Sequence, residues 1–400
     1  MVMESYKILG PFDRYNYGDL LFPLILEAYI KKYSTKPFTV EYYGLISSDL
    51  SQFGAKKTKN IKDFYSEIKD NDKVIIAGGE SLCTSWADLY SYLDPSFNSF
   101  YKNKYVRAVD RRVGVFSNYA KVRCGGKTQR PFTFPDRIEK SKISIFDNCV
   151  GGSAVATWSN TKVEALSKIL MTHTSVGVRD EVTYEKIRNI NKLTNLHLVP
   201  DSATLMARLL SNELENTWKI SKIPNLLNNN YVFFQVGSEK TENLDEVYRN
   251  LKQLLKETNL DLVLCPIGHA LGHEDFKPLA ILNKKLAEEY PQRVVFIYEQ
   301  IHIYEIMALI SQASLYIGTS LHGAITSLSF GVPYVTFNKD IKKLSAYIAT
   351  WGAENLKTQY DAKDIYMASR LALDISREDI LRVTEGHKDL VESFLSGLVK

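Results

Sequence analysis

The chain has 400 residues, which is long enough for two or three domains that each bury a hydrophobic core. Hydrophobic residues make up 45% of the composition and charged residues 24%, which excludes a disordered, collagen-like or low-complexity chain. The formal net charge of +4 is too small for a protein that coats nucleic acid, so no nucleic-acid partner is expected.

The four cysteines are far apart in the sequence, so neither a disulfide framework nor a zinc ribbon is expected. The first residues form no basic-then-apolar leader, and no apolar run approaches the ~18 residues of a membrane-spanning helix. These features predict a soluble, reduced, cytoplasmic protein.

In the first half, apolar β-branched runs alternate with amphipathic stretches, which is the pattern of a parallel sheet flanked by helices. The predicted elements are helices at 19–33 and 180–188 and strands at 6–12, 38–43, 73–77, 113–117 and 175–178. Residues 85–150 break the pattern with aromatic, basic and Gly-rich pieces. We expect long loops there, around the single strand 113–117.

The second half repeats the strand–helix pattern more regularly, as one doubly wound domain requires. Its predicted elements are strands at 231–236, 260–265, 293–298, 315–317 and 333–337 and helices at 244–258, 276–290, 303–313 and 323–330. Residues 210–230 are predicted to be a linker between the two domains. Residues 361–400 are predicted to form two helices, which could pack back across the junction between the domains. The sequence therefore predicts an α/β protein with two Rossmann-like domains, at 1–215 and 228–360, facing each other across a cleft.

Two segments of the first domain place polar or flexible residues directly after predicted strands. Residues 16–19 run from Asn16 to Asp19, where Gly18 permits a tight turn and Asp19 either caps the following helix or points into the cleft. After the third strand, Gly78 and Gly79 leave backbone N–H groups free to bind a phosphate or carboxylate. A purely structural turn explains each segment equally well.

Charged residues follow two later strands of the same domain. Arg179 comes directly after the strand 175–178, where it is a candidate clamp for an anion. The alternatives are a surface pair between Arg179 and Asp180, or Asp180 as a simple helix cap. Asp201 is placed in the same way, at the end of a strand.

The most polar cluster of the second domain contains His269, His273 and Asp275, which are metal-ligand types. Gly268 and Gly272 argue against one regular helix that presents both rings on a face, so no metal site is expected. Histidines that contact a substrate in the cleft are favoured, with ordinary loop histidines as the alternative.

The strongest motif lies between residues 308 and 333. It predicts a helix, a buried strand, a Gly-Thr-Ser turn and a second helix with His322 at its start. Thr319, Ser320 and His322 would then lie beside the free N–H groups of a helix N-terminus, which is a ready anion site. The alternative is a capped core helix whose His322 bonds only to backbone.

These motifs occur in the order seen in polysaccharide pyruvyltransferases, and the resemblance spans roughly residues 8 to 350. It implies a two-domain fold similar to GT-B glycosyltransferases. It also implies transfer of the pyruvyl group of phosphoenolpyruvate onto sugar hydroxyls of a bacterial surface polysaccharide or its lipid-linked precursor, with formation of a pyruvate ketal and release of phosphate.

The resemblance also implies roles for individual residues. The expected donor-binding residues are Arg179, Ser320, Leu321, His322, Lys342, Gly78, Gly79 and His269, with Lys339 as a rival to Lys342. The expected acceptor-binding residues are Asn16, Asp19, Glu80, Ser81 and Trp86. The chain departs from the family at Ser320, which stands where the family has an Arg, so one anion-binding guanidinium is missing.

Phosphoenolpyruvate carries a carboxylate and a phosphate, so its site needs several cations and N–H donors. Its methylene carbon must accept a proton, for which His322 is the first choice as general acid. The attacking hydroxyl must lose a proton, for which Asp19 or Asp201 could serve as the base. No metal or redox cofactor is required.

The irregular residues 85–150 would shape the acceptor side. The aromatic candidates for stacking on sugars are Trp86, Tyr90, Tyr92, Phe97 and Tyr101, and the candidate cations for a diphosphate-lipid carrier are Arg111, Arg112, Lys121 and Arg123. Loop packing with solvated charge is the alternative. A lipid-linked acceptor would bring the protein into peripheral contact with the inner face of the membrane.

Two other functions stay open at this point. A GT-B glycosyltransferase with a nucleotide-sugar donor would use the same cleft and the same anion site. A non-catalytic sugar- or anion-binding relative would explain Ser320 in place of Arg.

Overall fold

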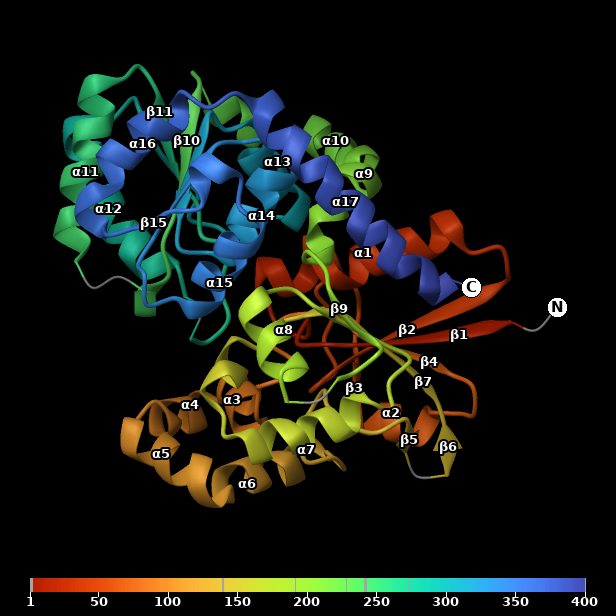
Figure 1. Ribbon diagram of the computed structural model, residues 1–400. Coiled ribbons are helices and arrows are strands. Elements are labelled where there is room, and N and C mark those ends of the chain that lie inside the picture. Colours follow the sequence, from red (N-terminus) through yellow and green to blue (C-terminus); the bar gives the residue numbers. More distant parts are fainter. Residues whose placement is uncertain are drawn as a thin grey trace.

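Two parallel sheets form the framework of the protein, each flanked by helices (Figure 1). The computed structural model describes residues 3–138, 140–190, 192–227, 229–240, 243–272 and 274–399. The strand orders are β3-β2-β1-β4-β7-β8-β9 in the first domain and β12-β11-β10-β13-β14-β15 in the second. The expected α/β class with two Rossmann-like domains is confirmed.

The strands of the two large sheets are all parallel to their neighbours. The first sheet contains β1 (Glu4–Leu9), β2 (Phe38–Gly44), β3 (Lys59–Asn60), β4 (Lys73–Ile76), β7 (Ser144–Val150), β8 (Ser175–Val178) and β9 (Leu196–Leu198). The second contains β10 (Tyr231–Gln235), β11 (Asp261–Leu264), β12 (Val294–Phe296), β13 (Leu315–Gly318), β14 (Tyr334–Phe337) and β15 (Gln359–Tyr360). A small antiparallel pair is formed by β5 (Arg137–Ile138) and β6 (Ser141–Lys142).

Helices connect these strands and close the chain. Those up to residue 220 are α1 (Tyr17–Tyr33), α2 (Ile61–Glu67), α3 (Trp86–Ser91), α4 (Pro95–Tyr101), α5 (Lys104–Val113), α6 (Val115–Cys124), α7 (Asn160–Leu170), α8 (Glu181–Arg188), α9 (Met206–Leu209) and α10 (Ser211–Ile220). The later ones are α11 (Leu244–Glu257), α12 (Phe276–Glu289), α13 (Ile303–Gln312), α14 (Leu321–Ser329), α15 (Lys342–Trp351), α16 (Ile365–Leu373) and α17 (Arg377–Val399).

The first sheet separates two hydrophobic cores because its side chains alternate between its faces. In β1, Tyr6 and Ile8 join a core that continues into the second domain, whereas Leu9 joins a core confined to the first. In β4, Ile75 points to the shared core and Val74 to the other. The shared core therefore ties the two domains together.

The strand order of each sheet reverses once, between β1 and β4 in the first domain and between β10 and β13 in the second. At such a switch point the connecting segments run to opposite faces of the sheet and leave a crevice at the carboxyl ends of the strands. The fold thus supplies one crevice in each domain.

The expectation of long loops around a strand at 113–117 is wrong. Residues 86–124 form the four helices α3–α6, and Gly114 ends α5 and precedes α6 with a left-handed backbone (φ 70°). The short Val-Gly-Val run resembles a strand, but it is the junction of two helices. The strands that the described part of residues 85–150 does contain are the short pair β5 and β6 and the strand β7 of the large sheet, none of which the sequence analysis identified.

The long C-terminal helix α17 contacts both domains (Figure 1). Lys73 of β4 donates a hydrogen bond to the carbonyl of Leu398 at 2.9 Å, and the Thr384 hydroxyl donates to the carbonyl of Leu328 in α14 at 3.0 Å. The segment expected as a linker is itself largely helical, because it contains α10, which packs against α13. Among the described residues, no helix is long and apolar enough to cross a bilayer.

Candidate functional site

A pocket of about 1210 Å³ lies where the crevices of the two domains meet. Common single-ligand pockets have volumes of about 300–1,000 Å³, so this one has room for two substrates. Its wall contains residues that follow the four strands at the two switch points, namely Asn16, Asp19, Gly79, Glu80, Gln235, Gly237, Thr319, Ser320 and His322.

Direct contacts between the domains fix the geometry of this pocket. The backbone N–H of Tyr17 donates to the carbonyl of Ile267 at 3.0 Å, and that of His269 donates to the carbonyl of Tyr15 at 3.1 Å. Deeper in the junction, the hydroxyls of Tyr17 and Thr326 are 2.9 Å apart. These contacts hold the start of α1 against the second domain.

Arg179 is buried at the bottom of the pocket between two carboxylates. Its guanidinium donates to Asp201 at 2.8 Å and to Glu80 at 2.9 Å. Burial alone would raise the pKa values of both acids. The neighbouring positive groups outweigh it and lower both pKa values: Arg179 and His322 act on Asp201, and Arg179 and Lys343 act on Glu80. The positive charge of Arg179 is therefore already matched before any ligand binds.

His322 is the second residue of α14 and lies in the pocket wall. Its Nε2 is 3.7 Å from Asp201 Oδ2 and has no hydrogen-bond partner among the described residues. The ring packs edge-to-face on Phe22, with centroids 5.3 Å apart. A Cβ on Gly18 would lie 1.9 Å from His322 Nδ1, so this glycine is needed for the close approach of the ring rather than for a turn.

The start of α14 adds backbone donors to the same wall. The Ser320 hydroxyl accepts a hydrogen bond from the N–H of Gly323 at 3.3 Å, so the serine that replaces the family arginine caps the helix. The N–H groups of Leu321 and His322, in the first turn, have no acceptor within the helix. They are suited to binding an anion.

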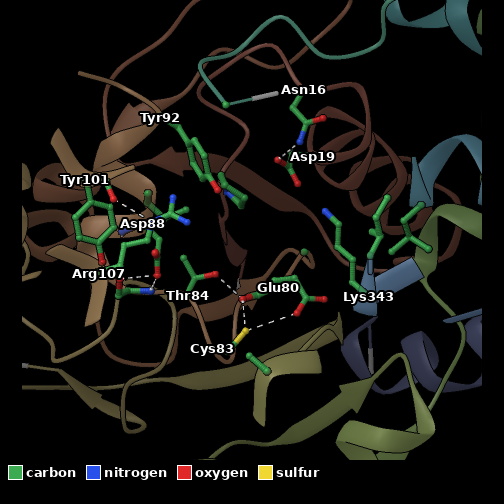
Figure 2. A pocket seen from close by; sticks show the side chains of 18 of the residues that line it. Asn16, Asp19, Glu80, Cys83, Thr84, Asp88, Tyr92, Tyr101, Arg107 and Lys343 are labelled. Carbon is green, nitrogen blue, oxygen red and sulfur yellow. Dashed lines mark hydrogen bonds between the residues drawn. The ribbon is translucent and has the colours of Figure 1, made fainter. Parts of the chain in front are cut away.

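Lys343 is the lysine that reaches the pocket, and the expectation of Lys342 or Lys339 is wrong. Lys343 extends from α15 between Asp19 and Glu80 (Figure 2). Burial lowers its pKa, and the nearby Arg179 charge acts in the same direction. By contrast, Lys342 is exposed, and Lys339 pairs with Asp361 at 3.0 Å.

Five expected site residues lie behind the pocket wall rather than in it. Trp86 is 1% exposed in the core that is confined to the first domain, and its indole N–H donates a hydrogen bond to the carbonyl of Thr128. The Ser81 hydroxyl donates a hydrogen bond to the carbonyl of Gly78, and Gly78 itself packs on Phe22. The ring of His269 packs on Tyr15. Asp201 is fully buried behind Arg179. Asp201 therefore positions Arg179 and His322 and does not reach a substrate hydroxyl.

The remaining expected residues do line the pocket. They are Asn16, Asp19, Gly79, Glu80, Arg179, Ser320, Leu321 and His322. The amide of Asn16 donates to the Asp19 carboxylate at 2.7 Å, which orients Asp19 (Figure 2). His273 lies outside the described residues.

The sequence analysis missed Asp275 as a pocket acid and considered it only as a metal ligand. Its carboxylate accepts hydrogen bonds from Gln235 Nε2 at 2.9 Å and from the N–H groups of Ile267 and Gly268 at 3.1 Å. Burial raises the pKa of Asp275 to about 7, so it exchanges a proton near neutral pH. No three His, Cys, Asp or Glu side chains gather as metal ligands within the described part of the chain.

The outer part of the pocket is formed by α3–α6 and the segment before α7. Its cations are Arg107, Arg111, Arg130 and Lys162, none of which has a carboxylate partner among the described residues. Arg130 and Lys162 lie 4.5 and 3.9 Å from the ring centroid of Trp158. The sequence indicated only Arg111 of this group, because Arg107, Arg130 and Lys162 are brought to the pocket by the packing of α5, the segment before β5 and α7.

Only some of the aromatic and basic residues expected on this side reach the pocket. Tyr92, Tyr101 and Arg111 line it. Tyr90 and Phe97 instead pack against each other in an edge-to-face contact, with centroids 5.1 Å apart. The other expected cations, Arg112, Lys121 and Arg123, lie outside the pocket wall.

The family model for polysaccharide pyruvyl transferase matches residues 16–340, which cover most of the chain and most of the residues that line the pocket, although not Lys343. The chain belongs to the polysaccharide pyruvyl transferase family. This pyruvyl transferase is accordingly a transferase enzyme with a role in polysaccharide synthesis. No protein with a curated description matches its sequence.

Solved structures similar to this pyruvyl transferase show the same two-domain fold. S. aureus MnaA, determined with UDP, has a TM-score of 0.54 at 10% identity, over 96% of this chain and 91% of that one. The UDP-GlcNAc 2-epimerase of Neisseria meningitidis, bound to UDP-GlcNAc, has a TM-score of 0.54 at 11% identity, over 99% of each chain. At such low identity the similarity concerns the fold alone.

Proposed function

We propose that this pyruvyl transferase uses phosphoenolpyruvate as its donor and forms a pyruvate ketal on two hydroxyls of a sugar. The sugar belongs to a bacterial surface polysaccharide or to its lipid-linked precursor. The observation that carries the proposal is the convergence of Lys343, His322 and the first turn of α14 on one wall of the pocket.

The donor carries a phosphate and a carboxylate, and the inner wall offers a matched set of groups for them. Lys343 supplies a buried positive charge, and the N–H groups of Leu321 and His322 supply uncharged donors. Arg179 is already neutralised by Glu80 and Asp201, so its contribution is to hold Glu80 and the pocket floor in place.

The reaction moves two hydroxyl protons and breaks one bond to phosphate. A first hydroxyl attacks the central carbon of the donor as the methylene carbon takes up a proton and becomes a methyl group. The carbon–oxygen bond to phosphate then breaks, phosphate leaves with the electron pair, and a second hydroxyl closes the ketal. One proton ends on the methyl group and the other leaves with phosphate or water.

His322 is the proposed acid and Asp19 the proposed base. His322 lies at the start of α14, beside the donor-binding groups, and is held by Phe22 and Gly18. Of the two acids that the sequence indicated, Asp19 lines the pocket and Asp201 does not. Asp201 faces His322 from behind and orients it.

The outer wall is the proposed acceptor side. Tyr92 offers aromatic surface for a sugar, and Arg107 and Arg111 offer cations for a diphosphate carrier. Such a carrier would be anchored in the membrane, which places the enzyme at the inner face of the membrane, in peripheral contact.

Phosphate release from phosphoenolpyruvate, measured across a panel of saccharide acceptors, tests this function. We expect acceptor-dependent release and a thermal shift with phosphoenolpyruvate. UDP- and GDP-sugars form the second arm of the experiment. A thermal shift and product formation with only a nucleotide sugar would overturn the proposal in favour of a glycosyltransferase.

A further inference from the structure

Helices α5 and α6 present apolar side chains to solvent in two regular stripes. In each helix these residues recur every three or four positions, so they lie on one face. The exposed fractions are 70, 52 and 60% for Tyr105, Val109 and Val113 in α5, and 55, 51 and 77% for Val115, Tyr119 and Val122 in α6. Scattered exposed apolar residues are ordinary, but six on two consecutive helices mark an interaction surface.

The same segment carries a strong local excess of positive charge. Residues 102–123 contain seven Lys and Arg residues and a single acidic one, Asp110. Asp110 is buried and accepts hydrogen bonds from Tyr101 and Ser117, so it does not face solvent. The segment alone therefore exceeds the formal charge of +4 of the whole chain.

Another helix shows that exposed apolar residues alone do not define such a surface. Met367 and Leu371 in α16 are each 61% exposed and lie four residues apart. Their surroundings, residues 361–374, contain three Asp residues against one Lys and one Arg. The combination of apolar stripes with cations distinguishes α5–α6.

We propose that the face of α5 and α6 formed by Tyr105, Val109, Val113, Val115, Tyr119 and Val122 is a membrane-binding surface for anionic lipid. Apolar and aromatic side chains of an amphipathic helix insert at the level of the headgroups, and flanking Lys and Arg bind anionic headgroups. Five of the seven basic residues lie outside the pocket wall, and they make the segment complementary to an anionic bilayer rather than to a neutral one. Both helices form the outer rim of the first domain, away from the second domain (Figure 1).

The position of this surface next to the pocket gives it a role in catalysis. Val113, Gly114 and Ser117, at the junction of the two helices, belong to the pocket wall. A bilayer seated on the stripes would thus bring a lipid-linked sugar to the mouth of the pocket. This role, but not the membrane binding itself, rests on the proposed function.

Flotation of the full-length protein with vesicles tests the proposal. We expect binding to vesicles that contain phosphatidylglycerol, and little binding to vesicles of phosphatidylcholine alone. Replacing Tyr105→Ser, Val109→Ser and Val122→Ser together should weaken binding about tenfold or more. Val113 is left intact because it lines the pocket. The matched control, Met367→Ser with Leu371→Ser, should bind as the parent protein does.

A charge variant separates the two parts of the interaction. Lys104→Gln with Arg112→Gln should weaken binding to the anionic vesicles about tenfold and leave the weak binding to neutral vesicles unchanged. Equal binding by the parent and both α5–α6 variants, at equal thermal midpoints, would overturn the proposal. So would a parent that stays in the unbound fraction and instead self-associates in solution through these residues, as light scattering would show.

The outcome is independent of the donor chemistry. With a water-soluble acceptor, the serine variant should release phosphate at the parent rate, because none of its substitutions touches the pocket wall. Vesicle binding without any turnover of phosphoenolpyruvate would contradict the proposed function but would still support the membrane-binding surface.

Discussion

The inner and outer walls of the pocket differ in whether their arginine and lysine side chains are paired with carboxylates. On the inner wall, Arg179 is buried and bonded to two carboxylates. On the outer wall, Arg111 is exposed and Lys162 is held over Trp158 with no acidic partner within the described residues. One wall is a closed network, and the other offers charge to a ligand.

This difference matches two kinds of substrate. A network that is complete before the ligand arrives fixes groups in place and costs little reorganisation during reaction, which suits a small reacting donor. Cations on several separate segments, without acidic partners among the described residues, tolerate variation in the position of an anion, which suits a larger acceptor.

Arg179→Ala should have the largest effect and act on stability. It leaves the fully buried Asp201 without its main partner, and breaking a buried ion pair in this way costs about 3–5 kcal/mol. Urea denaturation measures the loss. Arg111→Ala on the outer wall should have the same free energy of unfolding as the parent. An equal loss in the two variants would remove the distinction between the walls.

His322→Ala should lower the turnover of phosphoenolpyruvate at least ~100-fold, because loss of a general acid has about that effect. The fold should survive, since the ring lies at the pocket wall. His269→Ala is the matched variant, because the structure places that histidine against Tyr15 and outside the wall. Steady-state kinetics should show near-parental turnover for His269→Ala. Parental turnover in the His322 variant would exclude it as the acid.

Lys343→Met should raise the KM for phosphoenolpyruvate about tenfold or more, because it removes the positive charge that lines the proposed donor site between Asp19 and Glu80. Methionine retains the apolar stem, so α15 should pack as before. Lys342→Met changes the neighbouring, exposed lysine and should leave KM within twofold of the parent. A larger effect on KM at Lys342 than at Lys343 would show that Lys342, which the family resemblance implied, is the donor-binding lysine and that Lys343 is not.

The sequence predicted which residues line the pocket where one strand and its following loop decide their position. Asn16, Asp19, Glu80, Arg179 and the His322 turn each follow a strand, and parallel strands bring their carboxyl ends to one edge of the sheet. This rule places them at the crevice without knowledge of the strand order.

The predictions from sequence failed where packing between distant elements decides. Lys343 precedes the buried Tyr347 by one helical turn, and only recognition of α15 as a helix would have distinguished it from Lys342. Trp86 reads as a sugar-stacking aromatic, but its indole N–H meets the carbonyl of Thr128, and the ring fills the core. Asp201 follows a strand as expected, yet Arg179 covers it, and no local pattern reports that burial.

Asp275→Asn should have the most specific effect, on the pH dependence of stability. In the unfolded chain this carboxyl titrates near 3.8, whereas burial raises its pKa in the fold to about 7. Between these values the unfolded state is ionised and the folded state holds the proton, so the stability of the parent falls as pH rises through this window. The loss is at most about 1.4 kcal/mol per pH unit.

Asparagine at position 275 keeps an acceptor oxygen for Gln235 and cannot ionise, so the variant escapes this loss. Its free energy of unfolding relative to the parent should therefore rise from pH 5 to pH 7 and become constant above. Urea denaturation of both proteins at a series of pH values measures the difference, and the other titrating groups cancel. Parallel curves would mean that Asp275 is ionised in the native protein. The inner wall would then carry one more negative charge at neutral pH, which would oppose binding of the anionic donor.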